Sequence, residues 1–150
     1  MRIRDATAAD AAAACDVLRR SIAELCGADH GGDPAVLAAW LANKTPANLA
    51  AWIGAPGNAV LLAEAAGRVL GIAAMTAAGE VTLNYVAPEA RFRGVSRALL
   101  AALEDRARAA GLARCTLHST LTARRFYTAA GYAETGPAGA DGIPMAKPLG

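Results

Sequence analysis

The sequence lacks most features that mark secreted, membrane-spanning or metal-binding proteins. Its three cysteines, Cys15, Cys26 and Cys115, are widely spaced and form no Cys-x-x-Cys pair, which argues against a disulfide framework and a zinc site. We expect them to be small buried side chains in a reduced compartment. No stretch reaches the roughly 18 apolar residues of a membrane-spanning helix, and no His, Cys, Asp and Glu cluster has metal-ligand spacing. The sequence therefore predicts a cytoplasmic protein without a metal ion or a membrane partner.

Aromatic residues and net charge are also scarce. Aromatics make up 5% of the chain, and the formal net charge is +2 without a face-wide run of basic residues. This balance argues against the strong positive potential with which proteins bind nucleic acid or anionic membranes. Hydrophobic residues, many of them alanine, make up 55% of the 150 residues, so we expect a closely packed, helix-rich core. The length suits one domain over residues 1–150.

Hydrophobic periodicity predicts a mixture of strands and helices. Alternation between turn residues predicts strands, and a 3.6-residue period predicts helices. Short links make the second, third and fourth strands antiparallel, whereas a helical crossover makes the fifth parallel to the fourth. The fold class is thus α/β, with a mixed, mostly antiparallel sheet of about six to seven strands flanked by helices. The predicted strands are 2–4, 59–64, 68–75, 80–86, 114–119, 132–135 and 143–147, and the predicted helices are 7–25, 34–41, 46–53, 96–110 and 123–130, with a mobile glycine-rich loop at 27–34.

Some polar side chains in these elements are expected to serve structure or solubility. On helix 96–110 we expect Glu104 to face solvent and to pair with Arg108 one turn later. His118, in strand 114–119, points either toward a ligand site or into packing, and packing is the commoner case.

The turn between strand 80–86 and helix 96–110 is the best candidate for a functional site. A helix N-terminus offers unsatisfied N–H groups and the positive end of a dipole, and small residues let an anion approach them. The turn is therefore predicted to bind phosphate. It contains three arginines, one glycine and one small hydroxyl residue: Arg91, Arg93, Gly94, Ser96 and Arg97.

Two separate motifs surround this turn. The first consists of Leu83, Tyr85-Val86, Pro88-Glu89, Arg91, Gly94 and Leu99-Leu100. The second runs from Ala123 through Phe126-Tyr127 to Gly131-Tyr132. They resemble the L-x-Y-V-x-P-E-x-R-x-x-G…L-L and A-x-x-F-Y-x-x-x-G-(F/Y) patterns of the GNAT superfamily of acyl-CoA-dependent N-acyltransferases. Ser96 replaces the glycine or alanine that usually ends the family's turn, so we expect weaker rather than abolished phosphate binding.

The resemblance implies the GNAT fold, in which two central parallel strands splay apart and coenzyme A enters the notch between them. The N–H groups from Arg93 to Arg97 would hold the pyrophosphate, and the main chain around Tyr85 and Val86 would pair with the pantetheine arm. Thr120 stands where the family often has an asparagine that bonds this arm. The residues expected to bind the cofactor are Tyr85, Val86, Arg91, Arg93, Gly94, Val95, Ser96, Arg97, Thr120 and Arg124.

The resemblance also assigns chemical roles. Tyr127 would be the general acid that protonates the departing thiolate. Glu80 is the best candidate for the general base, because the histone-acetylating branch of the family has a glutamate at that position; a solvated carboxylate at the end of a strand is the alternative. Cys115 and His118 face opposite sides of their strand, which disfavours a covalent nucleophile and favours direct attack by the amine.

The sequence thus predicts an N-acetyltransferase that moves an acetyl group from acetyl-CoA to a primary amine and releases coenzyme A. The acceptor would be a small molecule or a peptide. Many relatives in the family dimerise, so a homodimer is a further expectation. Two alternatives are a catalytically silent acyl-CoA-binding module and a nucleotide-binding protein that uses the same turn for ATP, although the turn has no Walker lysine.

Overall fold

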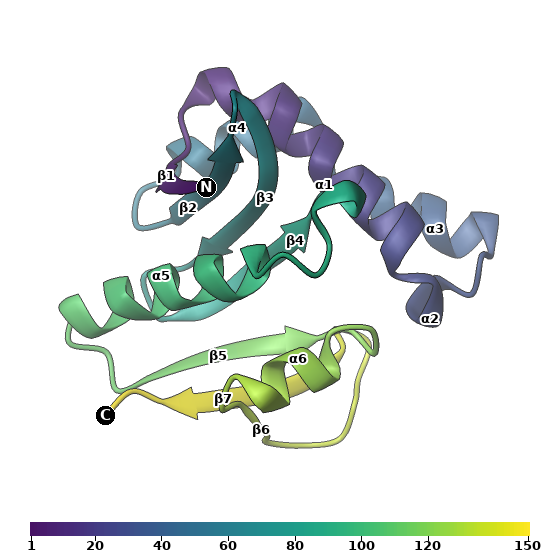
Figure 1. Ribbon diagram of the computed structural model, residues 1–150. Coiled ribbons are helices and arrows are strands. Elements are labelled where there is room, and N and C mark those ends of the chain that lie inside the picture. Colours follow the sequence, from purple (N-terminus) through teal and green to yellow (C-terminus); the bar gives the residue numbers. More distant parts are fainter.

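A seven-stranded sheet forms the centre of the computed structural model, which describes residues 1–150. The strand order is β1-β2-β3-β4-β5-β7-β6, and only β4 and β5 run parallel (Figure 1). The mixed α/β architecture predicted from the sequence is therefore confirmed. The strands are β1 (Arg2–Asp5), β2 (Ala59–Ala65), β3 (Arg68–Met75), β4 (Glu80–Val86), β5 (Arg114–Ser119), β6 (Ala133–Glu134) and β7 (Ile143–Pro148).

Helices cover both faces of this sheet. Side chains of α1 and α4 pack in one core cluster, and side chains of α5 and α6 pack in another on the opposite face. Because β2 and β3 are buried on both faces, their sequences are almost continuously apolar. None of the helices combines the length and the hydrophobicity that crossing a membrane requires. The helices are η1 (Ala8–Asp10), α1 (Ala11–Leu25), α2 (Gly27–His30), α3 (Pro34–Leu41), α4 (Pro46–Gly54), η2 (Pro88–Ala90), α5 (Val95–Ala109) and α6 (Arg124–Ala129).

The two parallel strands pair over a very short distance. The register joins only Glu80 to Thr116 and Val81 to Leu117. Just beyond these pairs, the register between β3 and β4 skips Thr82, which is a β-bulge of the kind that bends and twists a strand. The rest of β4 therefore has no strand partner on the side of β5, and Figure 1 shows β5, β7 and β6 diverging from the first four strands.

The segment predicted as a mobile loop over 27–34 instead begins with the short helix α2. Its His30 is buried, with Nε2 3.1 Å from the carbonyl oxygen of Ile22, while Nδ1 accepts the N–H of Gly32. Asp29 accepts hydrogen bonds from the N–H of Leu121 at 2.6 Å and from the hydroxyl of Thr122 at 2.6 Å. These bonds hold α2 against the loop that follows β5, across the diverging strands.

The prediction that Glu104 faces solvent is wrong. Its side chain is buried between α5 and β7, where Oε2 accepts the hydroxyl of Tyr132 at 2.8 Å and Oε1 pairs with Nζ of Lys147 at 2.9 Å. Arg108, the expected partner, pairs with Asp105 instead. Because α5 spans the region where the sheet splits, its polar stripe meets β7 rather than water. This buried pair links α5 to the second half of the sheet.

Lys147→Met should therefore weaken the fold markedly. The variant leaves the buried carboxylate of Glu104 with only Tyr132 as a partner, and breaking a buried ion pair in this way costs about 3 kcal/mol of unfolding free energy. Urea denaturation measures this loss. Arg108→Met, which removes an exposed pair with Asp105, is the matched control and should change the free energy by less than about 1 kcal/mol. Equal small losses in both variants would contradict the structural role of Glu104.

Candidate functional site

A cavity of about 440 Å³ opens where β4 and β5 diverge. It is lined from five directions: by the second half of β4, the end of β5, the first turn of α5, the end of α1, and α6 with the loop before it. The volume lies in the usual range for small-molecule sites. The divergence of the sheet thus creates a cleft that several elements reach, as expected at a topological break.

The first turn of α5 forms one wall of this cavity. Gly94 precedes the helix with φ of +76°, a left-handed conformation that glycine adopts without strain. The N–H groups at the start of a helix have no intrahelical partner, so those of Val95, Ser96 and Arg97 are available to a ligand. Together with the helix dipole, they make this wall suitable for an anionic group such as a phosphate.

Gly71 of β3 brings this helix end against the sheet. A Cβ atom at Gly71 would lie 2.8 Å from Cγ1 of Val95, 3.0 Å from Cδ1 of Leu99 and 3.0 Å from the carbonyl oxygen of Tyr85. Only a glycine permits this close approach of α5 to β3 and β4. The position of the turn before α5 therefore depends on a residue that lies outside the turn.

The unpaired edge of β4 forms a second wall. The N–H of Ala87 bonds the carbonyl oxygen of Leu70 in β3 at 2.8 Å. Because main-chain groups point alternately to the two sides of a strand, the N–H of Val86 faces the open side, toward the cavity. An extended ligand can therefore pair with β4 at this edge, as a strand would.

Tyr127 lies in the middle of the cavity wall formed by α6. It is buried against the rings of Phe126 and Tyr132, with ring centroids 5.1 and 5.6 Å away. Burial raises the pKa of its phenol to about 12, and the nearby amide of Asn84 opposes this shift. The phenol is therefore protonated at neutral pH and can donate its hydrogen.

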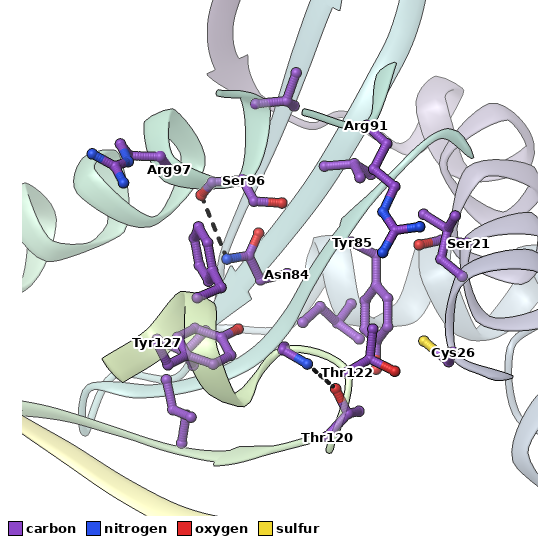
Figure 2. A pocket seen from close by; sticks show the side chains of 18 of the residues that line it. Ser21, Cys26, Asn84, Tyr85, Arg91, Ser96, Arg97, Thr120, Thr122 and Tyr127 are labelled. Carbon is purple, nitrogen blue, oxygen red and sulfur yellow. Dashed lines mark hydrogen bonds between the residues drawn. The ribbon is translucent and has the colours of Figure 1, made fainter. Parts of the chain in front are cut away.

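Asn84 of β4 stands between Tyr127 and the first turn of α5 (Figure 2). Its Nδ2 donates a long hydrogen bond of 3.5 Å to the carbonyl oxygen of Ser96, whereas its Oδ1 is buried and has no hydrogen-bond partner. A buried acceptor without a partner is costly, and a ligand N–H in the cavity would satisfy it. Sequence analysis missed Asn84, although a polar residue between Leu83 and Tyr85 in a mostly apolar strand is a usable signal.

The other predicted site residues divide into two groups. Tyr85, Arg91 and Thr120 line the same cavity as the turn and Tyr127. Arg93 and Arg124 do not, and Arg124 forms an ion pair with Glu134 instead. Glu80 is exposed at the start of β4, also outside the lining of the cavity.

Several neighbours of the site were not predicted, or were predicted differently. His118 is exposed and lines the cavity, so the expectation that it packs in the interior is wrong. Phe92 is 91% exposed and has φ of +66°, a left-handed conformation that is rare for a large side chain and occurs mainly at functional sites. Ser21 and Cys26, from the end of α1, also line the cavity, and no local sequence signal could have placed them there.

Comparison with known proteins identifies the family. A family model described as an acetyltransferase (GNAT) domain matches residues 28–148. The chain belongs to the GNAT family of acetyltransferases. No curated protein matches its sequence.

Solved structures support this assignment. A GCN5-related N-acetyltransferase from Rhodopseudomonas palustris has 26% identity and a TM-score of 0.89, with 99% of this chain and 95% of that chain covered. The structure of yncA from Salmonella typhimurium with its cofactor acetyl-CoA has 25% identity and a TM-score of 0.74, covering 100% and 94%. An aminoglycoside 6′-N-acetyltransferase from Enterococcus faecium shares the fold at 15% identity and a TM-score of 0.74, covering 99% and 97%. The GNAT protein described here is thus an acetyl-CoA-dependent acyltransferase.

Gly71→Ala should displace the first turn of α5. Overpacking at the contact with Val95 and Leu99 is expected to lower the free energy of unfolding by about 1–3 kcal/mol and to weaken binding of coenzyme A, measured by calorimetric titration. Gly54→Ala is the matched control, because a Cβ atom there meets nothing within 4 Å, and it should leave both quantities unchanged. Unchanged coenzyme A affinity in Gly71→Ala would show that the close packing of α5 against β3 does not determine how the cofactor binds.

Proposed function

We propose that this protein is an N-acetyltransferase in which a primary amine attacks acetyl-CoA directly within a ternary complex. One observation carries the proposal: a helix N-terminus suited to phosphate, an unpaired strand edge and a buried phenol line a single cavity. Bound acetyl-CoA supplies an activated thioester, and the protein has to hold it, orient it and manage two protons.

The residues of the cavity fit coenzyme A at both ends of the molecule. The N–H groups of Val95, Ser96 and Arg97 would hold the pyrophosphate, and the positive charge of Arg97 lies on the same wall. The open edge of β4 at Val86 would pair with the pantetheine arm. The buried Oδ1 of Asn84, which lacks a partner, fits an amide N–H, and the pantetheine arm carries two such groups.

Tyr127 is proposed to protonate the departing sulfur. Its pKa of about 12 keeps the phenol protonated, and its place between β4 and α6 puts the hydroxyl in the cavity. As the bond from the amine nitrogen to the acetyl carbon forms, the bond from carbon to sulfur breaks, and the sulfur takes the phenolic proton. The proton that the amine loses restores the phenol through solvent or a base, so the enzyme ends as it began.

Two groups are available as the base that takes the proton of the amine. Glu80 remains the base proposed from the sequence, although it would have to act through water because it lies outside the cavity lining. The imidazole of His118 lines the cavity itself, and histidine is the side chain that most often serves as a general base. A comparison of Glu80→Gln with His118→Asn decides between them, since loss of the true base should lower kcat/KM and remove the limb of the pH profile that this base causes, whereas the other variant should keep both.

Tyr127→Phe tests the proposed acid. We expect kcat with acetyl-CoA and an accepted amine to fall about a hundredfold, while the affinity for coenzyme A stays within about twofold of the wild-type value. Tyr132→Phe is the matched control, because Tyr132 is a neighbouring buried tyrosine that bonds Glu104 and does not line the cavity; it should keep kcat.

Two other results would contradict the role of Tyr127 or the proposed activity of the protein. Full activity in Tyr127→Phe would show that another group protonates the sulfur. Binding of coenzyme A without acetylation of any amine in a broad library, read by mass spectrometry, would favour a catalytically silent acyl-CoA-binding module.

A further inference from the structure

The half of the cavity nearest α1 is separate from the phosphate-binding wall. Ser21 and Leu25 of α1 and the following Cys26 line it, together with Tyr85 and Thr122. Figure 2 shows Tyr85 and Cys26 on one side of the cavity, and Ser96 and Arg97 on the other. Apolar surface and a few hydroxyl groups dominate this half. Coenzyme A bound along α5 and β4 would leave this space for the amine that accepts the acetyl group, so we call it the acceptor half.

No aspartate or glutamate lines any part of the cavity. Three acids lie near this half, in the last turn of α1, in α2 and in η2, and none of them lines it. Glu24 is exposed on α1. Asp29 accepts bonds from the loop before α6, including the hydroxyl of Thr122. Glu89 receives two bonds from Arg20, at 2.9 and 3.1 Å, and pairs with Arg68 at 3.5 Å. The lining of this half therefore contains no carboxylate that could contact a positively charged substrate directly.

Arg91 is a cation at the edge of this half. It lines the cavity, has no carboxylate partner, and stacks over the ring of Phe92 at 4.7 Å from the ring centroid. In Figure 2 its guanidinium group points toward Ser21 and Tyr85 and away from Arg97. Its charge is also felt at Cys26: burial and the negative charge of Asp29 raise the pKa of that thiol to about 11, and Arg91 acts in the opposite direction. The side chain of Arg91 therefore lies in the acceptor half of the cavity, although its main chain belongs to the turn before α5.

We propose that the acceptor is a small primary amine that carries a carboxylate, and that Arg91 binds this carboxylate. The proposal rests on the acetyl transfer proposed above and names its substrate class. A guanidinium group presents a planar fork of donors that matches a carboxylate with two parallel hydrogen bonds. The main chain of Phe92 has a left-handed conformation, and its exposed ring stacks against one face of the guanidinium group of Arg91.

Size and charge favour the same class. The cavity of about 440 Å³ has to take the pantetheine end of coenzyme A and the acceptor together, which leaves room for a molecule the size of an amino acid. A polycationic acceptor such as an aminoglycoside would meet Arg91 and no carboxylate in the cavity lining, which is unfavourable. In the reaction the amine nitrogen gains the acetyl group and loses a proton, the sulfur gains a proton, and the carboxylate takes no part.

The test compares amino acids with the corresponding amino acid amides, which keep the amine and lose the negative charge. The value measured is the ratio of kcat/KM for acid over amide, with acetyl-CoA saturating and pH fixed. Because each ratio is compared between enzymes, the different amine pKa values of acid and amide cancel. We expect the best wild-type substrate to be an acid, and Arg91→Gln to lower its ratio about tenfold to a hundredfold.

Two variants separate this role from others. Arg91→Lys keeps the charge without the planar fork and should retain part of the preference. Arg97→Gln removes an equal charge from the opposite wall, so it should keep the ratio within about twofold while KM for acetyl-CoA rises. Thermal unfolding confirms that each variant is folded, as expected for exposed side chains.

Two results would overturn the substrate class: a wild-type preference for amides or polycations, or an unchanged ratio in Arg91→Gln. The proposed acetyl transfer, and the substrate class with it, would be contradicted if coenzyme A protects the protein in thermal unfolding but no acid, amide or polyamine is acetylated.

Discussion

The separation of β4 from β5 after two residue pairs is the constraint on which the rest of the structure depends. A continuous sheet would leave no cavity, because the side chains of α5 and α6 would close over it. The bulge at Thr82 starts the separation, and the main-chain groups of β4 beyond it are left without a strand partner. Water has to satisfy these main-chain groups in the free protein, and a ligand that pairs with them replaces that water. The same feature that weakens the sheet thus makes it able to bind.

A sheet with so short a central pairing needs other connections. The buried group of Glu104, Lys147 and Tyr132 joins α5 to the second half of the sheet. Asp29 makes a second connection from α2 to the loop before α6. Both lie at the margins of the cavity and keep its walls in place while leaving the interior open. The charged side chains that line the cavity itself are those of Arg91 and Arg97.

Much of this could be read from the sequence because it depends on local signals. Alternation and glycine turns located the strands, and Gly94 before an apolar helix located the turn that begins α5. The surroundings of single side chains could not be predicted in this way. Glu104 has the spacing of a surface residue and is buried only because the sheet splits beneath α5. His118 and Cys26 reach the cavity through contacts between distant segments, and the role of Gly71 depends on how closely α5 approaches β3.

The most direct test of the account is a crystal structure of the protein with acetyl-CoA. We expect pyrophosphate oxygens within about 3 Å of the N–H groups of Val95, Ser96 and Arg97, and the thioester sulfur within hydrogen-bond distance of the hydroxyl of Tyr127. We also expect the side-chain oxygen of Asn84 to accept an N–H of the pantetheine arm. A diphosphate bound away from the start of α5, or a cofactor that leaves the edge of β4 unpaired, would contradict the account.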